Sequence, residues 1–484
     1  MRIYLALPSS HNNRRIKLSK HIKKIIISAV TAFLLCSPAA AIYNKGLSAS
    51  AIDTVYTIFP DINATDWFAA DVKKLTDAGL ISGYPDGYFH PDREMTVAEF
   101  LKIISPQGKL QLTGNVQLYP EHWASEYLTY AYENDIITDQ DLISGFDPDE
   151  LIDRFTMIKM MVTALNIKPA EVENPFTDTT DKYAITAYNE YLLRGYIQPN
   201  GSRLFSGEQI ATRSEAVTIA IRVIEYREDS YEFKKNAVLE NAKNNILRTE
   251  HEIIDLFHVL NREFMTEFTF QTSQTTRFLR EYCERSNVLN LEYFYNAFTN
   301  ITPLGNGNYK ITIEYLPDID TVKNYHKEAV KAADKIISEN ITSEMTDAEK
   351  VRVLHNYLVA NCEYDIVNYN KGTITQESRL AYGALINKKA VCQGYCAAFS
   401  LLCGRAGVSC IVVGGNAPNS HDSHAWNVVL IDGKRYHVDT THDDPVPDQK
   451  GIISDKYFCL TEDEMISYGY TWDKKSSALK YLYY

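Results

Sequence analysis

A cysteine, a histidine and an aspartate, in that order along the chain, could form a thiol-based catalytic site. Cys392 begins a segment whose apolar residues recur at helical spacing as far as the stop signals Gly404 and Gly407, so we expect it to begin a helix. The unpaired N–H groups and the positive dipole end of a helix start both favour a thiolate, which is the nucleophilic form. His424 and Asp439 lie downstream. This order of residues suggests acyl transfer through a thiol.

The spacing of His424 and Asp439 is compatible with one β-hairpin. Two alternating, β-rich segments, residues 424–431 and 434–441, flank Asp432-Gly433, a pair that favours a two-residue type I′ turn. This turn places His424 and Asp439 on the same face as diagonal neighbours, about 7–8 Å apart at the backbone. A three-residue loop would place them on opposite faces. The sequence therefore predicts an imidazole oriented by the aspartate, with its other nitrogen free to take a proton from the cysteine.

The C-terminal part of the chain, residues 347–465, resembles the transglutaminase-like (transglutaminase core) superfamily. Three motifs in the family's order carry the resemblance: VCQGYC at 391–396, HAWN at 424–427 and YHVDTTHDDP at 436–445. The resemblance implies a papain-like, transglutaminase-like α+β core. It implies no cofactor.

The same resemblance assigns Cys392 as the nucleophile, His424 as the base and Asp439 as its orienting partner. It implies attack of the thiol on a peptide bond or glutamine carboxamide in a protein or peptide substrate, with the acyl group then passed to water or to an amine. For an exported bacterial member, hydrolysis is slightly favoured over protein cross-linking. Many members carry tryptophan where this chain has His442, which leaves the triad intact but bears on the shape of the pocket.

Other interpretations of these residues remain open. Cys392-x3-Cys396 and His421-x2-His424 have a spacing that could supply four zinc ligands, although the aspartate then has no role. His424 could also be a buried structural histidine. His437 shares a face with His424 in the predicted register and could be the partner of the aspartate instead. A structural core would make the protein a catalytically inactive scaffold or a zinc-stabilised domain.

The length and charge of the chain restrict its class. Its 484 residues accommodate about three domains. The net charge is −13, and residues 1–41 hold seven Lys and Arg and no acid, so the rest of the chain carries a net −20. An acidic body argues against nucleic acid as the main partner.

Residues 1–41 have the pattern of a secretory signal peptide, with basic residues, a short apolar core at 25–36 and small residues at 39–41. This core is too short for a comfortable membrane span, and no other segment is long and apolar enough to cross one. Export permits disulfides, and the seven cysteines beyond the signal are an odd number, so at least one lacks a partner within the chain. Three cysteines are expected to be buried as small apolar residues: Cys396, Cys403 and Cys410.

Residues 52–226 contain a pattern that recurs about every 50 residues, at about 59–105, 119–165 and 176–226. Each copy is predicted to form a helix, a Gly/Pro-rich loop and a second helix. The second helix of each copy has a predicted N-terminal cap: Thr96 with Glu99, Asp153, and Thr212 with Glu215. A helix pair of this size cannot bury its own apolar face, so we expect the three copies to pack together as one all-α domain.

This repeat resembles the S-layer homology domain, in triplicate. Members of that family bind secondary cell-wall polysaccharide in Gram-positive bacteria, which implies a secreted protein associated with the cell wall. The family's Thr-Arg-Ala-Glu motif corresponds to residues 212–215, and its arginine corresponds to Arg213, to Arg154 in the second copy and to Val97 in the first. The resemblance implies polysaccharide-binding roles for Arg154, Arg213 and Trp67. The arginines could instead be solvated charges at helix ends, and the repeats a structural spacer.

Residues 227–345 are predicted to form a small α+β linker domain. Residues 232–269 are charged and periodic, which indicates long helices. Two β-rich segments flank a hairpin signal at 305–308, and a further helix is predicted at 322–340. Residues 343–347, which include Thr346, are predicted to cap the helix that leads into the catalytic domain, which is then expected to occupy residues 346–484.

Overall fold

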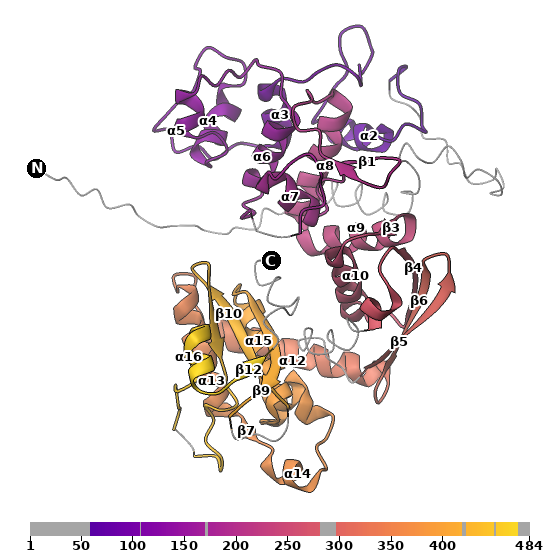
Figure 1. Ribbon diagram of the computed structural model, residues 1–484. Coiled ribbons are helices and arrows are strands. Elements are labelled where there is room, and N and C mark those ends of the chain that lie inside the picture. The colour runs from indigo at the N-terminus through magenta and orange to yellow at the C-terminus, as the bar shows by residue number, and fades with distance from the viewer. Residues whose placement is uncertain are drawn as a thin grey trace, which may run out of the picture. The chain divides into compact units, whose positions relative to one another are not determined.

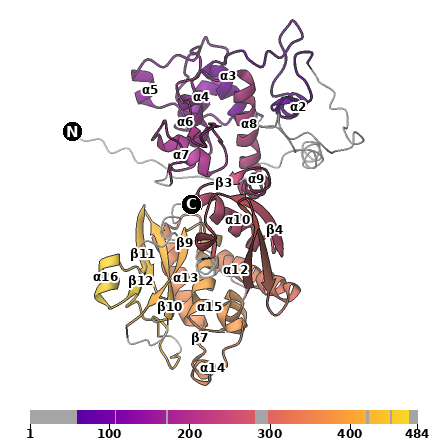
Figure 2. The same ribbon diagram turned by 45° about the vertical axis from the view of Figure 1, so that its right-hand side comes forward.

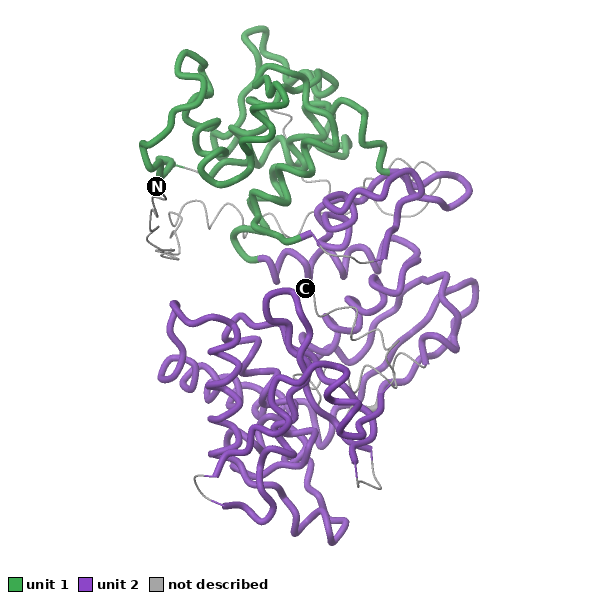
Figure 3. Tube along the Cα trace, turned by 60° about the vertical axis from the view of Figure 1, so that its left-hand side comes forward, with its two compact units in different colours: residues 1–168, 205–229 green, residues 169–204, 230–484 purple. Residues whose placement is uncertain are grey.

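The computed structural model describes residues 59–106, 108–169, 173–280, 297–418, 423–449 and 452–472. The predicted signal peptide, Cys283 and His421 lie outside these ranges. The described residues fall into two compact units (Figure 3): unit 1 holds residues 59–168 and 205–229, and unit 2 holds residues 169–204 and 230–472. This division differs from the predicted domain limits, because residues 176–204 of the third copy group with unit 2. Within the described ranges, no helix is both long and apolar enough to cross a bilayer.

Unit 1 is helical, and its helices begin at the predicted caps. The side chains of Thr96 and Thr212 form complete capping boxes with the glutamate three residues on, and Asp153 accepts the N–H of Thr156. These contacts satisfy N–H groups that have no acceptor within the helix. The helices of the unit are α2 (Ala69–Asp77), α3 (Val97–Ile104), α4 (Ser125–Glu133), α5 (Asp139–Ile143), α6 (Arg154–Ala164) and α8 (Arg213–Glu228).

A closed ring of backbone hydrogen bonds joins the starts of α3, α6 and α8. Met95 donates its N–H to Ala211, Ala211 donates to Ile152 and Ile152 donates to Met95, with N···O distances of 2.9–3.3 Å. Each of these residues directly precedes a capping residue, so the three helices begin around one centre (Figure 1). Because the cycle satisfies one donor and one acceptor of every member, the three segments stabilise one another.

The first part of unit 2 packs helices on a four-stranded sheet of order β3-β4-β6-β5. The prediction of helices up to residue 269 is wrong at its end: α10 stops at Arg262 and residues 267–272 form a strand, since Phe268, Phe270 and Thr272 alternate into the core. The hairpin at 305–308 is confirmed, with positive φ at both turn residues, Asn306 and Gly307. A two-stranded sheet, β1–β2, also departs from the all-α prediction for the third copy. The elements are α7 (Lys182–Asn189), β1 (Tyr196–Ile197), β2 (Arg203–Leu204), α9 (Ser230–Asn244), β3 (Ile246–Leu247), α10 (Glu250–Arg262), β4 (Glu267–Thr272), β5 (Ala297–Gly305) and β6 (Asn308–Tyr315).

The second part of unit 2 is an α+β domain built on an antiparallel sheet of order β11-β10-β9-β12. One face of the sheet packs against α15, with α12 and α13 completing that core, and the other face packs around Trp426 against the α16 region (Figure 2). The predicted helices at 322–340 and after Thr346 are confirmed. The elements are α12 (Ile319–Asn340), α13 (Asp347–Asn361), β7 (Glu363–Tyr364), α14 (Ile366–Lys371), η3 (Glu377–Arg379), η4 (Gly383–Asn387), β8 (Lys389–Ala390), α15 (Cys392–Arg405), β9 (Cys410–Asn416), β10 (Ser423–Ile431), β11 (Lys434–Val438), α16 (Glu462–Ser467) and β12 (Thr471–Trp472).

Candidate active site

Cys392 is the first residue of α15, as the sequence predicts, and its side chain is partly exposed. A first-turn residue lies among N–H groups that have no acceptor within the helix, at the positive end of the helix dipole. Further along the helix, Cys396 and Cys403 are fully buried in the core, which confirms their prediction, whereas Cys410 at the start of β9 is only half-buried. Cys392 is therefore the thiol of α15 that solvent can reach.

The β10–β11 hairpin brings His424 to Asp439. Ile431 pairs with Lys434 across the predicted two-residue turn. The predicted second strand, residues 434–441, is too long: β11 ends at Val438, and Asp439 is the first residue of the loop that follows it. His424 Nε2 lies 2.7 Å from Asp439 Oδ2, and the carboxylate is fully buried. Since Nε2 is held by the aspartate, Nδ1 is the nitrogen left for Cys392.

The electrostatics of this pair favour its charged form. Burial alone would lower the pKa of His424, but the Asp439 carboxylate and a hydrogen bond with Cys392 raise it to about 10. Burial would likewise raise the pKa of Asp439, but the imidazolium and its hydrogen bonds lower it to about 2. At neutral pH the imidazole therefore carries two protons, one shared with the aspartate and one directed to the Cys392 sulfur.

Two further side chains meet the same carboxylate, and the sequence did not assign a role to either. The Tyr470 hydroxyl donates to Asp439 Oδ2 at 2.7 Å. The His442 ring stacks on His424 with centroids 4.3 Å apart and planes 11° apart. Tyr470 lies 31 residues beyond Asp439 with no motif around it, so no sequence pattern indicated it. The substitution of the family's tryptophan by His442 was the one available signal.

His437, considered as an alternative partner of the aspartate, lies opposite Val428 as predicted. Its Nδ1 accepts a hydrogen bond from the Trp426 indole at 2.9 Å. Trp426 is fully buried beneath the hairpin. The imidazole in contact with both Asp439 and Cys392 is that of His424.

Buried polar contacts fix two helices, α15 and α13, to the hairpin and its following loop. The Asn427 amide donates to the Cys396 carbonyl at 3.2 Å and to Ser400 Oγ at 3.0 Å. The Tyr395 hydroxyl donates to Asp444. The third contact joins α13 to the loop, with His355 Nε2 3.1 Å from Asp443 Oδ2 and both side chains fully buried. These contacts explain why the motifs contain asparagine, tyrosine and paired aspartates, because each joins a helix of the domain to the hairpin or to the loop that follows it.

Metal ligation can be examined at the same place. Among the described residues, His424, Asp439 and His442 have potential ligand atoms within 4.8 Å of one another. Hydrogen bonds among these side chains and Tyr470 already use those atoms. The four-ligand zinc arrangement considered from the sequence is not assembled by the described residues, because Cys396 is buried in the hydrophobic core and His421 lies outside them.

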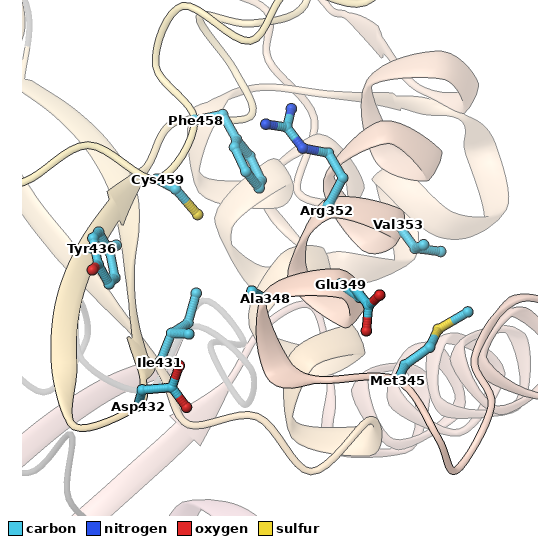
Figure 4. A pocket seen from close by; sticks show the side chains of 10 residues that line it. All are labelled: Met345, Ala348, Glu349, Arg352, Val353, Ile431, Asp432, Tyr436, Phe458 and Cys459. Carbon is cyan, nitrogen blue, oxygen red and sulfur yellow. The ribbon is translucent and has the colours of Figure 1, made fainter. Parts of the chain in front are cut away.

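A separate apolar pocket of about 720 Å³ lies between the start of α13 and the turn end of the β10–β11 hairpin (Figure 4). Val353, Ile431, Tyr436, Phe458 and Cys459 form much of its lining. His424 is at the opposite end of β10, and seven residues of strand at about 3.3 Å each separate the two ends by about 23 Å. The pocket therefore does not belong to the thiol site.

The residues predicted to bind wall polysaccharide lie in unit 1. Arg154 is only 6% exposed, and its guanidinium donates to Glu215 at 3.0 Å and to the Phe205 carbonyl at 3.1 Å. Arg213 is half-buried, donates to the Ser82 carbonyl and to the Tyr84 hydroxyl, and lies over the Tyr84 ring. Trp67 is 42% exposed and contacts Phe68 edge-on. Arg154 thus has a structural contact network, whereas Arg213 and Trp67 keep exposed surface.

Comparison with known families matches two parts of the chain. Residues 335–440 match the transglutaminase-like superfamily, and residues 58–101 match the S-layer homology domain. The first match begins within α12, inside the segment predicted to be a linker. The second covers the first of the three predicted copies.

Individual relatives match the same parts. The kyphoscoliosis peptidase of Homo sapiens is 29% identical over 126 residues, which are 23% of this chain and 18% of that protein. S-layer protein EA1 of Bacillus anthracis is 25% identical over 206 residues, 41% of this chain and 23% of that protein. A crystal structure of a TGase aligns over 36% of this chain and 50% of that one, with 15% identity and a TM-score of 0.24. The chain thus spans less than a quarter of either curated relative. It combines an S-layer homology domain with a domain of the transglutaminase-like superfamily.

Proposed function

We propose that this protein is an exported, cell-wall-anchored thiol acyl-transfer enzyme that acts on peptide or glutamine carboxamide bonds. The observation that carries the proposal is the buried His424–Asp439 pair at 2.7 Å, with Cys392 at the start of α15 contributing to the raised pKa of His424. A nucleophile, a proton carrier and an orienting carboxylate are thereby joined in one network. The similarity of this domain to a peptidase favours hydrolysis over cross-linking.

The reaction proceeds in two stages. The Cys392 sulfur attacks the carbonyl carbon, a C–S bond forms, and the carbonyl electron pair moves onto oxygen, where first-turn N–H groups of α15 can stabilise it. His424 holds the former thiol proton and transfers it to the leaving amine as the C–N bond breaks, while Asp439 holds Nε2–H and stabilises the imidazolium. Water or a primary amine then attacks the thioester, gives its proton to His424 and releases the cysteine.

Replacement of Cys392 by alanine is expected to lower kcat by at least about 10⁴-fold, because no neighbouring group can replace the nucleophile. The measurement is incorporation of a fluorescent primary amine into a glutamine-containing protein, together with peptide hydrolysis followed by mass spectrometry. The matched control is Cys459→Ala, which removes a half-buried thiol near the hairpin turn. Full activity in Cys392→Ala would refute the proposal. If the native protein has no activity and Cys392 is no more reactive than Cys459, the protein is an inactive wall-binding scaffold.

We also propose that the three N-terminal copies are S-layer homology repeats that bind secondary cell-wall polysaccharide on a Gram-positive cell. The family match to the first copy and the similarity to an S-layer protein support this proposal. The three helix starts are also equivalent: Val97, Arg154 and Arg213 each follow a capping residue. Each donates its N–H to a carbonyl of another copy at 2.7–3.0 Å.

Comparison of these three equivalent positions shows which side chain is missing at Val97, the position in the first copy. Arg213 reaches Ser82 and Tyr84 of a Ser-Gly-aromatic loop. At the position of Val97, the corresponding Ser144 and Phe146 line a cavity of about 250 Å³. The cavity offers space for an arginine side chain, and the one lysine of its lining, Lys159, is paired with Asp141 at 2.9 Å. The first position therefore lacks the arginine that could bind an anionic polymer group.

The full-length protein is expected to sediment with purified wall sacculi and to remain soluble once the wall polysaccharide is removed. Arg213→Ala should weaken binding by about 10- to 100-fold, since charged hydrogen bonds are worth about 1.5–3 kcal/mol. Val97→Arg should strengthen binding by filling the cavity with a cation, and a thermal unfolding curve for each variant serves as the folding control. Sedimentation that is unchanged by polysaccharide removal would contradict a polymer-specific anchor.

A further inference from the structure

His442 occupies an unusual place for a side chain outside the predicted triad. Its ring lies flat against His424, and its Nδ1 lies 3.2 Å from the same Asp439 oxygen that His424 contacts. Its backbone N–H also donates to the other oxygen of that carboxylate at 3.1 Å. The His442 side chain is 30% exposed, whereas that of His424 is 7% exposed. His442 is therefore the solvent-facing member of a stacked imidazole pair that shares one carboxylate.

The hydrogen-bond pattern determines the proton positions. Tyr470 has one hydroxyl proton, and the ionised Asp439 can only accept, so this proton is donated to the carboxylate. His442 Nδ1 also contacts the Tyr470 oxygen and must therefore donate to it. His442 thus holds Tyr470, Tyr470 holds Asp439, and Asp439 holds His424. Each of these contacts limits the rotation of the next group.

We propose that His442 is a positioning residue of the thiol site: its stacked ring and its contact with Tyr470 hold His424 in line with Cys392. This inference rests on the proposed thiol acyl-transfer function. Stacking fixes the plane of the His424 ring, and the Tyr470 contact fixes the carboxylate that fixes its direction. A neutral aromatic face against an imidazolium is also attractive, which stabilises the charged form of His424 that the reaction uses.

The charge of His442 should matter in acid. Burial lowers the pKa of His442, the Asp439 and Asp443 carboxylates oppose this, and the His424 imidazolium and Lys456 add to it. The rings of Tyr457 and Tyr470 also pack against the His442 ring. A neutral His442 supports the neighbouring imidazolium, and a protonated one repels it. Acidification should therefore lower the reactivity of the Cys392 thiol by protonating His442. A non-titrating aromatic residue at this position would not have this effect.

The test is the rate of Cys392 alkylation by iodoacetamide in the full-length protein between pH 4 and 9, with each cysteine followed by mass spectrometry. His442→Ala is expected to slow the reaction at pH 7 by about 10- to 100-fold, the usual cost of a catalytic group displaced by about 1 Å. His442→Trp, which restores a stacking ring with an N–H donor, should stay within about threefold of the native rate at pH 7. It should also keep that rate to lower pH than the native protein.

The outcomes separate this inference from the function on which it rests. If His424→Ala slows Cys392 while His442→Ala does not, the positioning role is overturned and the proposed function stands. If Cys392 in the native protein reacts no faster than Cys459, the proposed function fails, and the inference fails with it. If His442→Ala does not fold, the pH dependence of Cys392 alkylation in His442→Trp tests the positioning role instead. If the alkylation rate of Cys392 in His442→Trp falls at low pH just as in the native protein, the role of His442 is overturned. If the rate in this variant no longer falls over that pH range, the role is supported.

Discussion

Replacement of Asp439 by asparagine is expected to lower kcat/KM by about 10³- to 10⁴-fold while leaving the fold intact, because an amide cannot hold the imidazole as the carboxylate does. Asp439 accepts the Nε2 proton of His424 at 2.7 Å. An asparagine amide can present N–H to Nε2, which moves the imidazole proton to Nδ1 and turns a donor toward Cys392. The ring then cannot accept the thiol proton.

The matched control for this substitution is Asp432→Asn, at the turn of the same hairpin. Asp432 has a φ of 50° in the type I′ turn, and Asn-Gly suits that turn as well as Asp-Gly. The control should retain native kcat/KM within about twofold, since surface changes of this kind seldom exceed about 0.5 kcal/mol. If Asp439→Asn retained native kcat/KM, another group would have to orient the histidine.

The same substitution should change the pH dependence of stability. The pKa of His424 is raised to about 10, so its contribution to stability is fully present below its ordinary pKa of 6.5 and is lost as pH rises through about 10. The pKa of Asp439 is lowered to about 2, so its contribution is present above 3.8 and is lost as pH falls through about 2. The difference in unfolding free energy between native protein and Asp439→Asn should therefore be largest between about pH 4 and 6.5.

Replacement of Gly394 by alanine is expected to destabilise the protein by about 1–3 kcal/mol and to lower kcat by about 100-fold. A Cβ at this position would lie 2.5 Å from the Ser378 carbonyl oxygen, 2.9 Å from the Ala390 Cβ and 3.0 Å from the Leu380 carbonyl oxygen. Two of these atoms belong to backbone that cannot rotate away. The first turn of α15 would have to move, and Cys392 with it.

The control is Gln393→Ala, one residue earlier on the same helix. Gln393 is partly exposed and contacts Arg379 at 2.7 Å, so alanine removes one surface contact and creates no clash. Chemical denaturation should show a change below about 1 kcal/mol for Gln393→Ala. Equal stabilities for the native protein and Gly394→Ala would show that the close approach at the helix start carries no cost.

Local patterns in the sequence were sufficient to predict many of the elements around the site. The Asp432-Gly433 turn fixed the hairpin register, because a two-residue type I′ connection permits only one pairing of the flanking strands. Thr96, Thr212 and Thr346 predicted helix starts, because a capping box is formed within four residues. Strand β4 was missed, since its polar residues, of which only Glu267 is charged, alternate with two phenylalanines in a segment that continues a helical pattern.

The sequence by itself determined the order of the two kinds of domain, the start of α15 at Cys392 and the meeting of His424 and Asp439 at the end of one hairpin away from its turn, because each follows from interactions within short segments. Only the tertiary structure decided which groups complete the site. Tyr470 and His355 reach the aspartates from distant segments, and His442 lies against His424 only once the loop after β11 has folded back. Likewise, the burial of Arg154 against Glu215 depends on the closure of a ring of three copies. Such contacts join residues far apart in the chain, and their formation depends on packing that no local pattern records.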